Sequence, residues 1–450
     1  MMNNNDLTTG NLRKGLLGLA GPMLVGAVLQ NVQSFIDLFW VGRLGTNAVA
    51  ALGMSGTVLM MMFPIIMGMS AGTVAYVSRK VGEHDFAAAS SAAGQSLVIA
   101  LVLGITAGLT GAFFATPLLR LLDASPEVLS LGTAYLQISF LGSFTIFVLF
   151  IGNSILRAAG NSILPMYAMA CANILNVILD PIFIFGFKGI PGMGVSGAAL
   201  ATVLSQAIAA IGVVILISRG STHIKVNLKQ WKFIPSVAWK VVRIGIPSAW
   251  QMLSRSLMAL VIMNIVSQFG MLATAAYYIG LRFFMISIMP AFALGNAAAT
   301  IVGQNLGARQ PKRAQAAAWL AVRIDMIIMF IIGAILFIAA PELIRIFDKT
   351  PEVISIGTNY IRTVAPFFFF AGTGIILGRA LNGAGETMST MILTILCLWG
   401  IQVPAALILP KVLQPATQGI WWAISLAVSI HGISVITWFQ MGHWKRKRVD

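Results

Sequence analysis

The chain of 450 residues is dominated by apolar side chains: 58% are hydrophobic, 9% are charged, and the mean hydropathy is +0.89. Ordinary soluble domains carry roughly 25% charged residues, so the composition excludes a large soluble domain and predicts a polytopic α-helical membrane protein. The net charge of +16 does not predict nucleic-acid binding, because the basic residues gather in loops on one predicted side of the membrane.

Apolar stretches of about 20 residues or more, separated by short polar loops, predict twelve membrane spans. The first follows Arg13 and Lys14 and lacks a small-residue cleavage site, so we expect it to be retained. In chain order the spans are 16–39, 48–77, 88–115, 128–152, 163–186, 194–218, 246–268, 275–302, 315–340, 353–378, 387–409 and 418–440.

Basic residues between the spans predict the orientation in the membrane. With both termini inside, the inner segments hold 19 Lys and Arg residues and the outer loops hold 6, which predicts that both termini are cytoplasmic. The outer residues are Arg43, Arg120, Lys188, Arg345, Lys349 and Lys411. The inner residues are Arg13, Lys14, Arg79, Lys80, Arg157, Arg219, Lys225, Lys229, Lys232, Lys240, Arg243, Arg309, Lys312, Arg313, Arg379, Lys445, Arg446, Lys447 and Arg448.

The two halves of the chain repeat each other at one constant offset, which places Arg120 over Arg345. Residues 120–135 and 345–360 are identical at 9 of 16 positions, and 156–166 resembles 381–391. Six spans per half is an even number, so the halves share one orientation and form a parallel repeat about an axis along the membrane normal. The predicted fold is therefore all-α, with twelve transmembrane helices in two six-helix lobes around a central cleft.

The repeat also sets the predicted domains: an N-lobe at 1–218, a cytoplasmic linker at 219–243 and a C-lobe at 244–450. Within the repeated segments, Ser125 and Thr350 are each followed by proline and glutamate. We interpret these as structural signals, because Ser and Thr cap helices and Pro suits the first helical turn.

Polar residues interrupt the first span in a regular pattern. Pro22, Gly26, Gln30, Gln33 and Asp37 are spaced by four, four, three and four residues, which places them on one helix face. A carboxyl at the centre of a membrane helix costs about 2.5–3.5 kcal/mol on insertion scales. Some partner must offset this cost.

The fifth span supplies candidate partners for Asp37. Met169, Asn173, Asn176 and Asp180 also share one face, and two carboxyls in one desolvated site favour a proton held between them. The carboxyls have no counterparts in the second half, where Ile262 and Ala405 stand at the equivalent positions, so a repeated scaffold does not explain them. The other interpretation is that one acid caps a broken helix or lies near the outer interface.

The second half carries cations within its spans instead. Arg255 and Arg282 are the deepest and are expected at the cleft; both a substrate-binding and a structural role stay open for them. His431 is interpreted as a core residue.

Catalytic motifs are missing from the sequence. It has no Walker loop, HExxH or GxSxG motif, so we expect neither an enzyme nor a cofactor or resident metal.

Three segments carry a family resemblance over roughly residues 12–440. They are AGPMLVGAVLQNVQSFIDLFWVGRLG, NSILRAAGN and NILNVILDPIFIFG. With the six-plus-six repeat, they resemble the multidrug and toxic compound extrusion (MATE) transporters. The second half lacks the acids of the NorM-type branch, with Gln251, Arg255, Gly372 and Thr373 in those regions, and this pattern is similar to the DinF-like prokaryotic branch.

The resemblance implies a proton-coupled antiporter that expels lipophilic, often cationic drugs from a prokaryotic cell across the inner membrane. It implies a proton-responsive network of Asp37, Asn176 and Asp180, with Pro22 as the hinge of the first helix, and it places Arg282 near the cleft. Sixth-span Thr202 is a less certain match to that network. The implied substrate-binding residues are Gln30, Gln33, Asn153 and Met169.

The predicted mechanism is alternating access by a monomer, in which protonation of Asp37 bends the first helix at Pro22 and releases the drug. Its partners are small-molecule drugs, organic cations and the lipid bilayer. Two alternatives remain. Sodium could bind at Asp37, Asn176 and Asp180 in place of the proton, or the chain could be a lipid-precursor flippase of the same superfamily.

Overall fold

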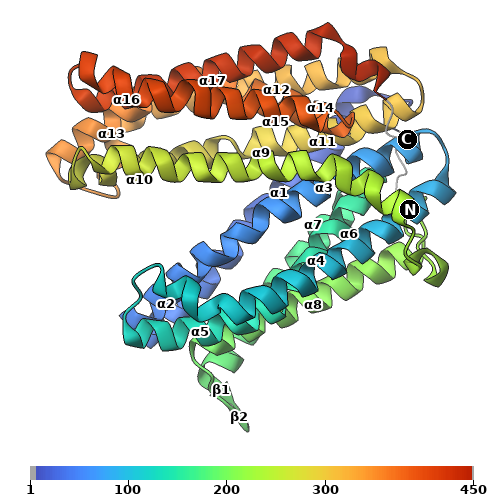
Figure 1. The fold of residues 1–450 in the computed structure, drawn as a ribbon, viewed down its shortest axis with the longest axis horizontal. Coiled ribbons are helices and arrows are strands. Elements are labelled where there is room, and N and C mark those ends of the chain that lie inside the picture. Colours follow the sequence, from blue (N-terminus) through green and yellow to red (C-terminus); the bar gives the residue numbers. More distant parts are fainter. Residues whose placement is uncertain (1–6, 448–450) are drawn as a thin grey trace. The chain divides into compact units, whose positions relative to one another are not determined.

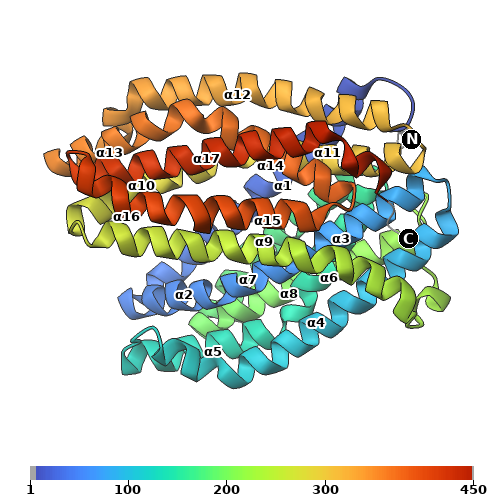
Figure 2. The same ribbon diagram turned by 45° about the horizontal axis from the view of Figure 1, so that its top comes forward.

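The computed structural model describes residues 7–447, which are almost entirely helical (Figures 1 and 2). It divides them into two compact units: residues 21–246, and residues 7–20 together with 247–447. Arg448, counted above among the inner basic residues, lies outside the described residues.

The first unit is built from long helices that pack side by side, α4 against α5 and α6, and α7 against α8. Its described elements are most of α1 (Leu12–Val41), η1 (Gly42–Leu44), α2 (Thr46–Leu59), η2 (Met60–Met62), α3 (Phe63–Gly82), α4 (Phe86–Arg120), α5 (Pro126–Leu141), α6 (Ser143–Ala158), α7 (Ile163–Phe185), the antiparallel pair β1 (Gly186–Phe187) and β2 (Ile190–Pro191), α8 (Val195–Ser218), η3 (Leu228–Trp231) and the start of α9 (Pro235–Ser267).

The second unit has the same plan, with α14 packed against α11, α12 and α17. It holds the rest of α9, then α10 (Met271–Ser287), α11 (Met289–Gly307), α12 (Pro311–Arg345), α13 (Pro351–Val364), η4 (Ala365–Phe367), α14 (Phe368–Gly383), α15 (Thr387–Cys397), the π-helix η5 (Leu398–Gln402), α16 (Val403–Val412), α17 (Ala416–Met441) and η6 (His443–Arg446).

The predicted fold class is confirmed. Among the described residues, eleven helical segments are long and apolar enough to cross a membrane, and a twelfth arises if α5 and α6, which meet at 46°, form one span. The constant offset of the sequence repeat is visible in the helix bounds, since α4 and α12 start and end at equivalent positions, as do α6 and α14. Figure 1 shows α4 to α8 in one unit and α10 to α17 in the other.

Two helices connect the units. The chain passes from one unit to the other between Ala20 and Gly21 in α1, and between Ile246 and Pro247 in α9. The repeated prolines, Pro22 and Pro247, therefore stand at these two crossings. Both helices are continuous through them, because a proline that lacks its N–H can bend a helix without ending it.

The predicted linker is partly packed onto the first unit. The fully buried amide of Gln95 on α4 donates to the carbonyls of Gln230 (3.1 Å) and Lys232 (2.8 Å), and its oxygen accepts the Ile234 N–H (2.8 Å). These bonds satisfy backbone groups of the stretch that leads into α9. The assignment of residues 219–243 as a cytoplasmic linker, and the lobe boundaries around it, stay predictions.

The two repeated helix starts differ in their caps. Ser125 accepts a hydrogen bond from the N–H of Val128 at 3.5 Å. Thr350 makes no such side-chain bond; instead its own N–H donates to Asp348 Oδ1 at 2.8 Å. The hydrogen bonds from Thr350 hold the pKa of the exposed Asp348 carboxyl below its ordinary value. The expectation that both residues cap through their side chains was therefore wrong for Thr350.

Candidate functional site

Helix α7 turns its polar side chains inward and its apolar ones outward. Asn176 and Asp180 are fully buried, whereas Ile174 is 61% exposed and Ile178 53% exposed. This pattern is the reverse of that of a soluble helix and suits a helix that meets lipid with its apolar face. Met169 and Asn173 lie on the same buried face.

Asn176 links two helices. Its Nδ2 donates to Asp180 Oδ1 at 3.0 Å, one turn along α7, and to Thr202 Oγ1 on α8 at 3.4 Å. One turn before it, Asn173 Nδ2 donates to the Leu29 carbonyl of α1 at 2.5 Å. The polar face of α7 therefore touches both α8 and α1.

Asp37 completes this cluster from α1. Its carboxyl is partly buried and lies beside the side chains of Asp180 and Asn176, with Tyr135 of α5 nearby. The structure thus brings together the three residues that the sequence predicts as the coupling network, Asp37, Asn176 and Asp180. It adds Thr202, which sequence spacing alone matched only weakly.

The cluster contains more hydrogen-bond acceptors than donors. Within the described residues, Asp37 Oδ1, Asp180 Oδ2, Asn176 Oδ1 and Asn173 Oδ1 are buried and have no hydrogen-bond partner. Ionised carboxylates and amide oxygens only accept, whereas a protonated carboxyl also donates. A proton or another cation would therefore satisfy this site better than any rearrangement of its own groups.

The four predicted substrate-binding residues come from three helices of the first unit. Gln30 and Gln33 lie on α1, Asn153 on α6 and Met169 on α7. Gln33 and Asn153 are buried, and within the described residues Gln33 Nε2 and Asn153 Oδ1 have no hydrogen-bond partner. Gln30 is partly buried.

The two arginines predicted at the cleft are not together. Arg282 of α10 is exposed, donates to Tyr278 OH at 3.1 Å and lies over that ring, with Cζ 5.2 Å from its centroid. Arg255 of α9 is partly buried and lines a small cavity with Arg379 of α14. Sequence reasoning missed Arg379 because it counted that residue among the loop charges.

The profile of the MatE family matches residues 22–182 and 247–408. These two segments make up most of the chain, and they begin at the repeated prolines, Pro22 and Pro247. The chain belongs to the MatE family. It is a membrane transporter and not an enzyme.

Individual members of the MatE family are similar over nearly the whole chain. A probable multidrug resistance protein of Bacillus subtilis, YpnP, is 28% identical over 447 residues, which cover 99% of this chain and 98% of YpnP. An FAD transporter of Shewanella oneidensis is 28% identical over 413 residues, 90% of each chain. A solved multidrug resistance MATE family transporter in its outward-facing conformation has a TM-score of 0.90 at 26% identity and covers all of both chains.

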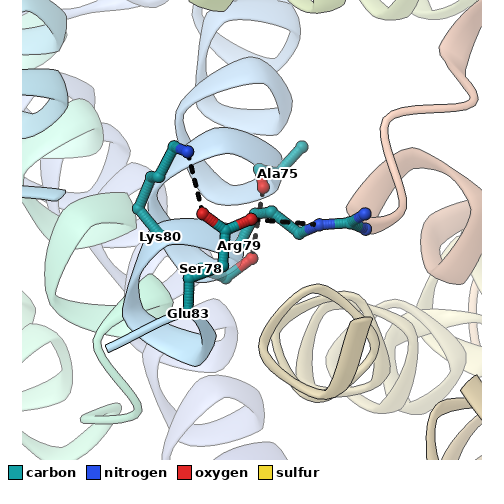
Figure 3. A network of polar contacts seen from close by, with 5 residues as sticks. All are labelled: Ala75, Ser78, Arg79, Lys80 and Glu83. Atoms are coloured by element: carbon teal, nitrogen blue, oxygen red, sulfur yellow. Dashed lines mark hydrogen bonds and ion pairs between the residues drawn. The ribbon is translucent and has the colours of Figure 1, made fainter. Parts of the chain in front are cut away.

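In this MatE chain the end of α3 carries a separate charged group (Figure 3). Glu83 lies 2.8 Å from Lys80 Nζ and 3.7 Å from Arg79 Nε, and Ser78 Oγ donates to the Ala75 carbonyl at 3.5 Å. These contacts lie within about two turns of one helix, and ion pairs between residues three or four positions apart contribute little to stability. The group belongs to the end of α3 and not to the acidic cluster.

Proposed function

We propose that the chain is a secondary active multidrug exporter, which exchanges lipophilic and cationic compounds for protons by alternating access. The observation that carries this proposal is the acceptor-rich cluster of Asp37, Asn176 and Asp180 in the first unit. The substrate class is supported by the similarity to YpnP and to the solved multidrug resistance transporter.

Coupling follows from competition for the charge of Asp37. When Asp37 and Asp180 are both ionised, Asn176 Nδ2 donates to Asp180 Oδ1, Asp37 Oδ1 has no donor within the described residues, and the two like charges repel. A cationic drug relieves this repulsion by its charge, and a proton relieves it by neutralising one carboxyl. Each ligand therefore weakens the binding of the other, which is the requirement for antiport.

Protonation also changes the contacts of α1. Neutral Asp37 gains an O–H donor and can bond an orphan acceptor such as Asp180 Oδ2. This pulls the end of α1 that carries Asp37 toward α7 and α8. Pro22, fifteen residues earlier, has no N–H to donate, so the helix bends there most easily. The bend reduces the space available to the drug and releases it.

The substrate is expected to lie near Gln30, Gln33, Asn153 and Met169. Gln33 Nε2 and Asn153 Oδ1 are buried polar atoms with no partner in the described chain, so they can bond polar groups of a ligand without breaking other bonds. The unbranched thioether of Met169 can adapt to drugs of different shape.

We further propose that the protein acts as a monomer in the inner membrane of a prokaryotic cell, with both termini cytoplasmic. The excess of inner over outer basic residues supports this orientation. A cysteine introduced at an exposed position near the start of the described chain, Thr9→Cys in a protein whose Cys171 and Cys397 are replaced by alanine, should react with a membrane-impermeant maleimide only after the cells are opened.

The decisive experiment measures efflux of a cationic dye from proteoliposomes that contain wild-type protein or Asp37→Asn. The two proteins are driven first by a pH gradient and then, separately, by a sodium gradient. We expect pH-driven efflux in the wild type and its loss by at least about a hundredfold in Asp37→Asn, since an amide cannot exchange a proton. A control variant, Asp123→Asn in an exposed loop, should transport normally.

Two results would overturn parts of this proposal. Efflux by Asp37→Asn at the wild-type rate would remove Asp37 from the mechanism. Efflux of the wild type driven by the sodium gradient alone would replace the proton by sodium, for which the same carboxylate and amide oxygens are suitable ligands.

A further inference from the structure

A small polar cavity lies inside the second unit, apart from the acidic cluster. It has a volume of about 20 Å³ and is lined by polar and cationic residues of α9 and α14 together with apolar ones. The lining residues that carry the argument are Gln251, Arg255, Gly378, Arg379 and Asn382. Two arginines thus line one cavity, and Cζ of Arg379 lies 5.4 Å from the ring centroid of Phe292, which lines it too.

A chain of hydrogen bonds fixes the wall behind Arg255. Arg255 Nη2 lies 3.4 Å from His431 Nε2, and Thr394 Oγ1 lies 3.2 Å from the same nitrogen. A guanidinium only donates, so His431 Nε2 must accept, and the histidine is neutral with its proton on Nδ1. The histidine therefore adds no charge and leaves the charge of Arg255 uncompensated.

The amides of the wall are held in the same network. Gln251 Nε2 donates to Thr394 Oγ1 at 2.9 Å and to the Thr390 carbonyl at 3.2 Å, while Asn382 Nδ2 donates to Gln251 Oε1 at 3.4 Å. Thr390 Oγ1 in turn donates to Asn382 Oδ1 at 2.7 Å. These bonds use the amide oxygens, so the wall presents few acceptors toward the cavity.

No carboxylate of the described second unit pairs with Arg255. Five acids occur there, and each is accounted for elsewhere: Asp325 packs against Gly372, Glu342 pairs with Arg345, Asp348 accepts from Thr350, Glu352 is exposed in the first turn of α13, and Glu386 pairs with Lys447. A partly buried cation without a counter-charge is expensive. No carboxylate of the described chain supplies this counter-charge to Arg255.

The size of the cavity limits what it can hold. Drug-binding pockets have volumes of about 300–1,000 Å³, far above the 20 Å³ found here. A volume of about 10–15 Å³ suffices for one water molecule. The cavity therefore fits one small group, and the uncompensated charge of Arg255 selects a negative one.

The position of the cavity in the repeat points to a ligand as well. When the two halves are aligned at their constant offset, Gln30 corresponds to Arg255, Asn153 to Gly378 and Met169 to Thr394. Three of the four proposed substrate-binding residues of the first unit thus have counterparts in the cavity or its wall. The second unit uses the same place in its fold, with the opposite electrostatic preference.

We propose that this cavity is an anion site, in which Arg255 and Arg379 bind a single anionic group. The group is either a free monovalent anion or the phosphate of a larger molecule, which share the chemistry of a charge-assisted bond to a guanidinium. The site goes beyond the proposed proton-coupled export, because neither Asp37 nor the proton takes part in it.

The test measures the thermal stability of the purified full-length protein while chloride replaces gluconate at constant ionic strength. Gluconate is the reference anion, since its carboxylate is attached to a hydroxylated carbon chain and is neither a free monovalent ion nor a phosphate, and constant ionic strength keeps the screening of other charges equal. A ligand that binds only the folded state raises Tm with its concentration. A second arm replaces chloride by phenyl phosphate, which separates a free anion from the anionic group of a larger ligand.

Arg255→Gln should lower the apparent affinity for the anion by about tenfold or more, since a bond to a charged group is lost. Arg379→Gln should weaken it as well. The matched control is Arg362→Gln: Arg362 is an exposed arginine of α13 in the same unit, where its Nε donates to the Phe337 carbonyl at 3.2 Å. This control should keep the full response to the anion.

Each outcome decides the proposal. A rise in Tm with chloride or with phenyl phosphate that Arg255→Gln abolishes and Arg362→Gln retains supports it and identifies the source of the anion. No rise with either ligand, or an equal rise in Arg255→Gln, overturns it. If Arg255→Gln does not fold, anomalous diffraction from wild-type crystals soaked in bromide decides, because a bromide peak must lie between Arg255 and Arg379.

Discussion

The two units share one fold but differ in polarity and charge at equivalent positions. Asp37 and Asn176 of the first unit correspond to Ile262 and Ile401 of the second, while Gln30 corresponds to Arg255. The first unit has buried acceptors that lack donors, and the second has in Arg255 a partly buried donor that no carboxylate of the described chain pairs. A duplicated scaffold has therefore been given two different electrostatic environments.

The comparison separates what holds the fold from what serves transport. Helix bounds repeat between the two halves, as α4 with α12 and α6 with α14 show. The buried side chains of Asn173, Asn176 and Asp180 do not repeat, although each of them is costly in a membrane. Apolar residues stand at the equivalent positions, Leu398, Ile401 and Ala405. The backbone diverges at the same place: residues 173–177 form regular helix in α7, whereas their equivalents form the π-helix η5, a feature that is frequent at functional sites.

The largest expected difference between the units concerns their two prolines. If α1 bends at Pro22 in response to Asp37, Pro22→Ala should reduce proton-driven dye efflux by about tenfold or more, since it restores a backbone N–H and stiffens the helix. Pro247→Ala, whose helix carries Arg255 and no acid, should stay within about twofold of the wild type. Both rates are measured in proteoliposomes.

Both proline variants should fold, because alanine is favoured over proline inside a helix by about 3 kcal/mol. Their thermal stability should accordingly equal or exceed that of the wild type. Equal losses of efflux in the two variants would contradict an asymmetric hinge. They would indicate that both helices crossing between the units must bend.

A second difference lies where α12 packs against α14. Asp325 is buried, both of its carboxyl oxygens lack a hydrogen-bond partner within the described residues, and its Oδ2 fills the space that a side chain at Gly372 would occupy. The equivalent pair in the first unit is Ala100 and Phe147, both fully buried. The larger residue of the pair is Asp325 of α12 in the second unit and Phe147 of α6 in the first unit.

Gly372→Ala should therefore destabilise the protein by about 1–3 kcal/mol, as overpacking of a tight interface does. In an Asp325→Ala background the same change should cost at least about 1 kcal/mol less, because the obstructing carboxyl is gone. Chemical denaturation of the wild type, Gly372→Ala, Asp325→Ala and the double variant measures these free energies of unfolding. Gly378→Ala on the same helix, where a Cβ meets no atom within 4 Å, is the control, and a loss equal to that of Gly372→Ala would refute this account.

The membrane fold and the acidic cluster could be predicted because both leave periodic patterns in the sequence. Asp37 and Asp180 are conspicuous on apolar helices, and their spacing places them on faces that can meet. Arg255 was predicted at the cleft, but the cavity that it lines with Arg379 was not, because Arg379 follows a predicted span and resembles an orienting loop charge. Neither the hydrogen-bond network of Gln251 with Asn382 nor the packing of Asp325 on Gly372 could be predicted, since both depend on residues far apart in the sequence.

The smallest expected difference between the units is in the caps of α5 and α13. Ser125→Ala removes a side-chain bond to the Val128 N–H and should lower the free energy of unfolding by about 0.5–1 kcal/mol. Thr350→Ala removes no such bond and should change it by less. In the second unit Asp348 Oδ1 accepts the N–H of Thr350, the residue before α13. The lowered pKa of Asp348 makes the contribution of this contact present near neutral pH and lost as the pH falls through the value in the folded protein. Asp348→Asn should therefore abolish a pH dependence of Tm between about pH 3 and 7. Thr350→Ala should only reduce it, because the Thr350 N–H still donates to Asp348 while the hydrogen bond from its side chain is lost. Equal pH profiles for the two variants would contradict this account.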